Sequence, residues 1–79
     1  MKLPRNVSGD RLADHLCRHW DYVRVTQVGS HIMLRTETPG HSRQVIPAHN
    51  PIKVGSFSKI LSQVAAHKQI SREEILRGL

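Results

Sequence analysis

Two stretches of the chain repeat their hydrophobic residues at the spacing of an α-helix. In the first, five apolar side chains form one stripe: Leu12, Ala13, Leu16, Cys17 and Trp20. Such a stripe is typical of a helix of about three turns with one buried face. Ser8 precedes it and can accept hydrogen bonds from amides of the first turn, so we expect it to be the N-cap. The polar flank of this helix should hold His15, Arg18 and His19.

The second helical stretch opens at Ser56, which we expect to cap it. Its apolar stripe consists of Phe57, Ile60, Leu61, Val64 and Ala65. A short last helix should follow Ser71, because Ser71 and Glu74 form the Ser-x-x-Glu pattern of a capping box. This last helix carries Ile75 and Leu76.

Between the two helical stretches the pattern changes to alternation, which favours β-strands. Three short segments rich in β-branched residues have it: residues 22–28, 31–37 and 43–46. Turns fall between them at residues 29–30 and 38–41. Pro47 should close the third strand, since it has no amide to donate to a ladder. We therefore expect a three-stranded antiparallel meander.

Alternation also assigns side chains to the faces of the sheet. In the middle strand Ile32 and Leu34 should face the helices, so His31 should face away from them. The first strand should set Val23 and Val25 together on one face. Arg24 and Thr26 should lie on the other face of the first strand. Met33 and Arg35 should lie on the same face as His31. The predicted fold class is α+β, in the order α-β-β-β-α with a short C-terminal helix and the helices on one face of the sheet.

Length and charge narrow the functional classes. The 79 residues suffice for one domain, residues 1–79. Lys and Arg number 12 against 6 for Asp and Glu, a net charge of +6, which favours a polyanionic partner: nucleic acid, an acidic protein or anionic lipid. The single cysteine, Cys17, excludes an intramolecular disulfide. We see neither a signal peptide nor a stretch of membrane length, so we expect a cytoplasmic protein with no membrane partner.

The tripeptide Gly29-Ser30-His31 is the first candidate for chemistry. A glycine turn lets the backbone of a polyanion approach closely. An imidazole exchanges protons near neutral pH, and RNA carries its own nucleophile, the 2'-hydroxyl beside each phosphate. His31 with nearby cations would therefore suffice for a minimal ribonuclease. The alternative is an ordinary surface histidine at the end of a hairpin.

The loop before the second long helix is a candidate phosphate site. Lys53 and Lys59 flank the expected helix N-terminus, where free amides attract anions. His49 in this loop is either a second proton-transfer group or, as we favour, a loop residue bonded to backbone. For each lysine the alternative is a solvated position on the surface.

The sequence gives little support for a metal site or for a reactive cysteine. His15 and His19 stand four residues apart, a spacing that can place two imidazoles on one metal, but no third ligand stands at the expected offset. Cys17 lies on the apolar stripe, so we expect it to pack rather than react. We predict neither a metal nor another cofactor.

The whole chain resembles the HicA family of toxin mRNA interferases. Five segments carry the resemblance: Lys2-Leu3-Pro4-Arg5 with Val7-Ser8, Gln27-Val28-Gly29-Ser30-His31, Val45-Ile46-Pro47-Ala48-His49, Lys53-Val54-Gly55-Ser56-Phe57 and Ser71-Arg72-Glu73-Glu74. The resemblance implies a fold similar to double-stranded-RNA-binding domains. It also implies mRNA cleavage that arrests translation, inhibition by a HicB-type antitoxin, and one catalytic histidine in the Gly-Ser-His motif, here His31.

We therefore predict a metal-independent endoribonuclease, the toxin of a toxin–antitoxin pair. His31 would be the catalytic residue, and the RNA-binding residues would be Gly29, Ser30, Arg35, Lys53 and Lys59. The partners would be mRNA and the antitoxin. Two other hypotheses remain: a non-catalytic RNA-binding module that reads A-form shape, and a protein whose basic face only docks an acidic partner.

Overall fold

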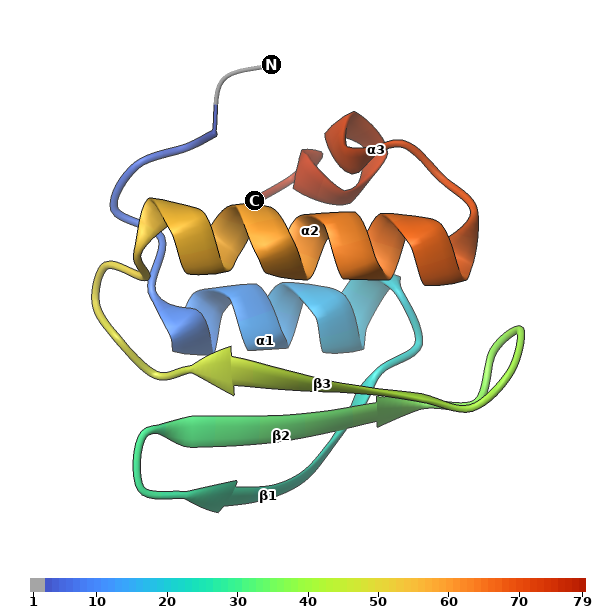
Figure 1. Cartoon of the computed structure of the whole chain (residues 1–79), viewed down its shortest axis with the longest axis horizontal. Coiled ribbons are helices and arrows are strands. Elements are labelled where there is room, and N and C mark those ends of the chain that lie inside the picture. Colours follow the sequence, from blue (N-terminus) through green and yellow to red (C-terminus); the bar gives the residue numbers. More distant parts are fainter. Residues whose placement is uncertain (1–2) are drawn as a thin grey trace.

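Three helices and three strands make up residues 3–79, the part of the chain that the structure, a computed structural model, describes (Figure 1). In chain order they are α1 (Gly9–His19), β1 (Val23–Val28), β2 (His31–Thr36), β3 (Ser42–Pro47), α2 (Val54–Lys68) and α3 (Arg72–Leu76). The α+β class and the order of elements are those that the hydrophobic periods predict. No helix within residues 3–79 is long and apolar enough to span a bilayer.

The strands form one antiparallel sheet in the order β1-β2-β3, which confirms the predicted meander. β2 is central and pairs on both sides. At its first residue, His31 stands opposite Val28 of β1 and opposite Pro47 of β3. β3 continues through Pro47, one residue beyond the predicted end.

The hydrophobic core lies between the sheet and the two long helices, α1 and α2. β2 contributes Ile32 and Leu34, and β3 contributes Ile46; none of the three is more than 1% exposed. The helices bury against them Leu12, Ala13, Leu16, Phe57, Ile60, Leu61 and Val64. Burial of one such large side chain contributes about 1.5–3 kcal/mol, so the helices are held on this face and the other face stays open. In Figure 1, α3 lies over α2, on the side away from the sheet.

The start of α1 is docked onto the end of β3. Ser8 caps the helix as predicted, its Oγ accepting from the Arg11 amide at 3.1 Å. The Gly9 amide donates to the carbonyl oxygen of His49 at 2.9 Å. A Cβ at position 9 would lie 1.8 Å from the carbonyl oxygen of Pro47, so only glycine permits this approach. The sheet end that carries His31 is therefore fixed to the first turn of α1.

Two local predictions about the helices are wrong. α2 begins at Val54 with Lys53 as its N-cap and without a side-chain capping bond, so Ser56 lies inside the first turn. His15 is not on the polar flank but is buried, with 6% exposure, and its Nε2 lies 2.6 Å from the carbonyl oxygen of Ile75. This hydrogen bond ties the His15 ring to the backbone of α3.

β1 also differs from the prediction in which residues share a face. The register with β2 shifts between Arg24 and Thr26, so that Val25 is an extra residue, a β-bulge. Thr26 therefore pairs with Met33 rather than sharing a face with Arg24. Every residue of this edge strand is exposed, and the side that faces α1 carries Arg24, which pairs with Asp10 and Asp14 of that helix.

Candidate nucleic-acid interface

The turn between β1 and β2 is held by hydrogen bonds on both of its sides. Gly29 has φ +57°, a conformation that favours glycine, and no atom would meet a Cβ there within 4 Å. Its carbonyl oxygen accepts from Nε2 of Gln27 at 3.0 Å. The carbonyl oxygen of Ser30 accepts from the Ala48 amide at 2.6 Å. The Gly-Ser-His segment is thus an open but anchored part of the surface.

His31 lies on the side of the sheet that faces away from the helices, which we call the open face. Its neighbour Ile32 is completely buried, whereas His31 is exposed, as strand alternation requires. Within residues 3–79 its ring makes no hydrogen bond. Both ring nitrogens are therefore accessible to a molecule that approaches the open face.

A groove lies next to this position, between β3 and α2. Its volume is about 340 Å³, and its lining residues are Arg43, Gln44, Val45, Pro47, Ser56, Lys59, Ile60 and Gln63. Pro47 belongs to it and is also the β3 partner of His31. The groove therefore reaches the strand pair that holds the exposed histidine, with the cations of Lys59 and Arg43 in its walls.

Arg43 is a cation that sequence reasoning did not select. It stands directly opposite Arg35 in the β2–β3 pairing, on the open face. Both line a second hollow of about 200 Å³ together with Val25, Thr26, Met33 and Leu34. Arg35 keeps its Nε 3.4 Å from Glu37, in a pair exposed to solvent. Alternation along β3 places Arg43 on the same face as Val45 and Pro47, but only the register with β2 sets it beside Arg35.

Lys53 lies outside this groove, although it is exposed and forms the N-cap of α2. The structure brings Lys59 together with Arg43 and Pro47, but not with Lys53. Gly29, Ser30 and His31 are consecutive at the turn, and Arg35 lies further along β2. The predicted residues thus lie in separate places: three at the turn, Arg35 in the second hollow, Lys59 in the groove, and Lys53 in the lining of neither.

Several other cations are used within the fold. Arg24 binds two carboxylates of α1, Asp10 at 3.4 Å and Asp14 at 3.0 Å. Lys68 donates to Thr36 Oγ1 at 2.9 Å and to the carbonyl oxygen of Thr38, and burial lowers the pKa of its ammonium group. In contrast, Lys59 and Arg43 form no ion pair with any residue of the described chain 3–79. Their charges are available to a partner.

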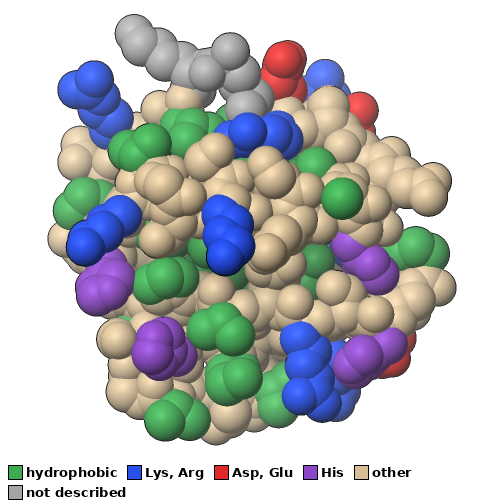
Figure 2. Space-filling model, in the orientation of Figure 1, with side chains coloured by type: hydrophobic (Ala, Val, Ile, Leu, Met, Phe, Trp, Pro, Cys, Tyr) green, Lys and Arg blue, Asp and Glu red, His purple; other side chains and the backbone are tan. Residues whose placement is uncertain are grey.

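Figure 2 shows one face of the molecule, on which Lys, Arg and His side chains are spread over the surface while acidic side chains stand near the edges. Four of the exposed large hydrophobic residues belong to the sheet: Val23, Val25, Val28 and Val45. They are about half exposed, between 45% and 64%. The sheet surface thus combines cations with apolar side chains.

The remaining histidines and the cysteine do not join this group. His49 is exposed, and its carbonyl oxygen accepts from the Gly9 amide. The rings of His15 and His19 lie 4.8 Å apart, but residues 3–79 contain no group of three metal-ligating side chains. Cys17 is half-buried, and burial raises the pKa of its thiol, which disfavours a nucleophilic thiolate.

Comparisons with known proteins add no relative to this description. No family model matches the chain, and neither a curated protein nor a solved structure matches it. The chain is a small basic α+β protein with a three-stranded antiparallel sheet, whose open face carries an exposed histidine beside a cationic groove.

Proposed function

We propose that the protein is a metal-independent endoribonuclease of the HicA toxin type, which cleaves mRNA in the cytoplasm, arrests translation and is neutralised by a HicB-type antitoxin. One observation carries the proposal: His31 is exposed on the open face and pairs with Pro47, a residue of the groove that holds Lys59 and Arg43. The α-β-β-β-α order supports the double-stranded-RNA-binding-like fold that the family resemblance implies.

The chemistry requires only an imidazole and cations. His31 takes the proton of a 2'-hydroxyl, O2' attacks the adjacent phosphorus, and the bond to the 5'-oxygen breaks. The 5'-oxygen leaves with a proton from solvent water, His31 returns its own proton to the solvent, and the other fragment ends in a 2',3'-cyclic phosphate. With the roles exchanged, His31 would instead supply the proton to the leaving oxygen. No metal takes part in either version.

The cations of the groove and the open face would bind and orient the RNA strand. Lys59 and Arg43 would hold phosphates in the groove, and Arg35 would hold one on the open face beside them. Gly29, which lacks a side chain, would let the RNA backbone approach Ser30 and His31. Lys53, at the start of α2, would contact the RNA outside the groove. Such phosphate contacts position the substrate without reading its sequence.

The antitoxin would cover the site. The valines of the sheet are exposed apolar side chains on the same sheet as the cations. An antitoxin surface that carries apolar residues and carboxylates would be complementary to both. A nuclease that acts on the transcripts of its own cell has to be held inactive in this way. We therefore propose that the antitoxin binds over His31 and the open face.

The test is expression from a tightly repressed promoter, with growth and intact mRNA as readouts. Wild type should arrest growth and lose full-length mRNA, whereas His31→Ala should do neither. His41→Ala is the matched control, because His41 is also exposed but lies in the loop at the other end of β2, where its Nδ1 is 2.8 Å from Glu37. Equal toxicity of wild type and His31→Ala would remove His31 from the mechanism. RNA bound intact by the purified wild type would favour a non-catalytic RNA-binding module.

A further inference from the structure

The second hollow, on the open face of the sheet, combines an apolar lining with a pair of cations. Its volume is about 200 Å³, and its lining consists of Val25, Thr26, Met33, Leu34, Arg35 and Arg43. The bulge in β1 brings the consecutive residues Val25 and Thr26 into this one lining, beside Met33 of the central strand. Val25 is 55% exposed, so its apolar surface is open to a ligand.

The register between β2 and β3 brings the two cations together. Arg35 and Arg43 stand directly opposite each other in the antiparallel pairing, and both line the hollow. Like charges at directly opposite positions repel each other and destabilise a sheet. An anion bound between the two guanidinium groups would remove this repulsion, and each guanidinium presents paired donors that match the oxygens of phosphate.

Glu37 offsets only part of this positive charge. Its Oε2 lies 3.4 Å from Nε of Arg35 and 2.8 Å from Nδ1 of His41, in pairs that are exposed to solvent. Exposed ion pairs contribute little free energy. Within residues 3–79, Arg43 has no ion pair and no acidic residue lines the hollow. The hollow therefore keeps a positive charge next to its apolar side chains.

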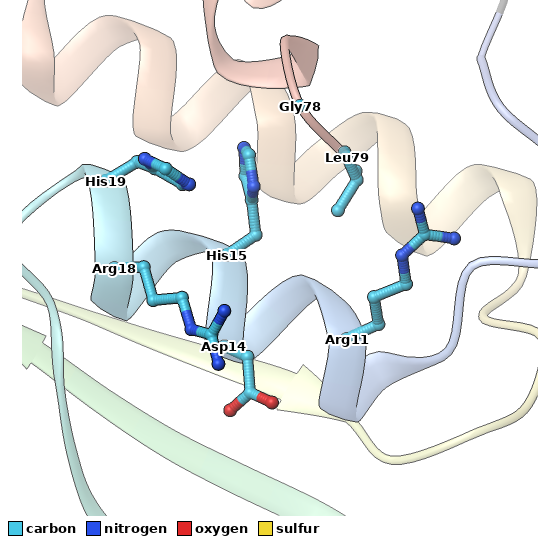
Figure 3. A pocket seen from close by; sticks show the side chains of 7 residues that line it. All are labelled: Arg11, Asp14, His15, Arg18, His19, Gly78 and Leu79. Atoms are coloured by element: carbon cyan, nitrogen blue, oxygen red, sulfur yellow. The ribbon is translucent and has the colours of Figure 1, made fainter.

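The cations of α1 do not meet in this way. A hollow of about 210 Å³ is lined by residues of α1 together with Gly78 and Leu79. In Figure 3 the side chains of Arg11 and Arg18, which both line it, point in different directions. Arg18 is exposed and forms no ion pair within residues 3–79, so it provides a control cation outside the sheet.

The second hollow lies on the same face of the sheet as His31. Arg35 follows His31 by four residues along β2, a distance of about 13 Å at about 3.3 Å per residue. His31, Met33 and Arg35 alternate onto the open face. A single strand of RNA that follows β2 would therefore place its cleaved bond at His31 and another of its nucleotides at the hollow.

We propose that the second hollow binds one nucleotide of a single-stranded RNA, whose base packs on Val25 and Met33 and whose phosphate is bound by Arg35 and Arg43. A nucleotide has both parts that the lining fits, a flat base and an anion. A base can enter the hollow only where it is unpaired, so the site selects single strands over duplexes. The inference rests on the proposed function for the identity of the ligand as RNA, but it does not require cleavage.

The experiment measures, by fluorescence anisotropy, how tightly the full chain binds RNA that cannot be cut. The probe is a short labelled single strand in which fluorine replaces each 2'-hydroxyl. Two further probes are the same strand annealed to its complement, and a strand of equal length and charge whose sugars carry no bases. The test variants are Arg35→Gln and Val25→Ser, with Arg18→Gln and Val23→Ser as their matched controls. Val23 is 49% exposed and belongs to the same strand as Val25, but it does not line the hollow.

We expect the single strand with bases to bind about fivefold more tightly than the strand without bases, and more tightly than the duplex. Arg35→Gln should weaken the binding of both single strands about three- to tenfold, because it removes a phosphate contact. Val25→Ser should weaken only the strand with bases, about threefold, because it removes apolar surface under the base. Neither control variant should change these affinities.

Equal affinity for the strands with and without bases would overturn the proposal. So would a duplex that binds at least as tightly as the single strand, or wild-type affinity in both Arg35→Gln and Val25→Ser. Cleavage is not part of this readout. If wild type cuts natural RNA while these variants bind as wild type does, the nucleotide site is refuted and the proposed function stands. If the binding results are as expected but natural RNA stays intact, the proposed function is refuted and the nucleotide site stands.

Discussion

Gly9 and Pro47 approach each other so closely that a Cβ on Gly9 would lie 1.8 Å from the carbonyl oxygen of Pro47. The same Cβ would lie 2.9 Å from the Cα of Ala48, so backbone, not a flexible side chain, fills the space. Pro47 is in turn the pairing partner of His31. A helix N-terminus far from the open face thus helps to fix the strand pair that presents the candidate catalytic residue.

Replacement of Gly9 by alanine should destabilise the fold. The added methyl group must push α1 away from β3, and overpacking of this kind costs about 1–3 kcal/mol. Gly55→Ala is the matched control, since no atom lies within 4 Å of a Cβ there and the residue is in α2. Alanine at position 55 should leave stability unchanged or raise it by up to about 1 kcal/mol. Urea denaturation of the three proteins measures both effects, and equal midpoints for Gly9→Ala and wild type would contradict the close contact.

Neutralising the groove should weaken RNA binding without changing the fold. Lys59→Gln and Arg43→Gln each remove one charge that has no ion pair within the described residues 3–79. Each should reduce affinity about three- to tenfold and lower the slope of log affinity against log salt by about one. Arg77→Gln, on an exposed residue that does not line the groove, is the control. Fluorescence anisotropy at several salt concentrations gives both quantities, and unchanged slopes for both groove variants would exclude the groove as the RNA site.

Stability should fall in mild acid because of His15. Burial lowers the pKa of this histidine in the folded protein, so the unfolded chain binds more protons as the pH falls. The stabilisation is complete above the ordinary histidine pKa of 6.5 and is lost progressively below it. Thermal unfolding from about pH 7.5 to about pH 5 should show a smaller loss in His15→Gln, which keeps a donor for the Ile75 carbonyl but does not titrate. His41→Ala should lose as much as wild type; an identical pH profile for His15→Gln would refute this role.

The valines of the open face should matter for antitoxin binding. Val28→Asp places a charge beside His31 on an area that we expect the antitoxin to cover, and should weaken the complex at least tenfold. Val54→Asp is the control, since Val54 is 68% exposed but lies on α2. Co-purification with the product of an adjacent small open reading frame, followed by calorimetry, measures the difference. A complex that leaves His31 uncovered would contradict occlusion.

Local patterns predicted most of the fold because each element repeats its apolar residues with its own period. Ile32 and Leu34 could be assigned to the core from alternation alone, and from that the exposure of His31 followed. The errors lie where distant parts of the chain meet. His15 is polar and sits beside the apolar stripe, and its buried ring bonds the backbone of Ile75, sixty residues later, which no local pattern predicts.

The candidate site was predictable to a similar extent. The Gly29-Ser30-His31 turn shows in the sequence because it joins two alternating segments. The place of Arg43 beside Arg35 could not be predicted, because it depends on the register between β2 and β3, which no local sequence pattern gives. The bulge at Val25 likewise results from strand pairing, and it sets Arg24 and Thr26 on opposite faces of the sheet.

The most direct test of the central claim is cleavage of a defined RNA by purified protein in the presence of a chelator. Wild type should cut the RNA and leave 2',3'-cyclic phosphate ends, and a single 2'-deoxy substitution at the cut site should block cleavage there. His31→Ala should be slower by a factor of about 10²–10⁴, the usual contribution of a general acid or base, while His41→Ala should match wild type. Cleavage by His31→Ala at the wild-type rate, or cleavage that continues at the 2'-deoxy position, would contradict the account.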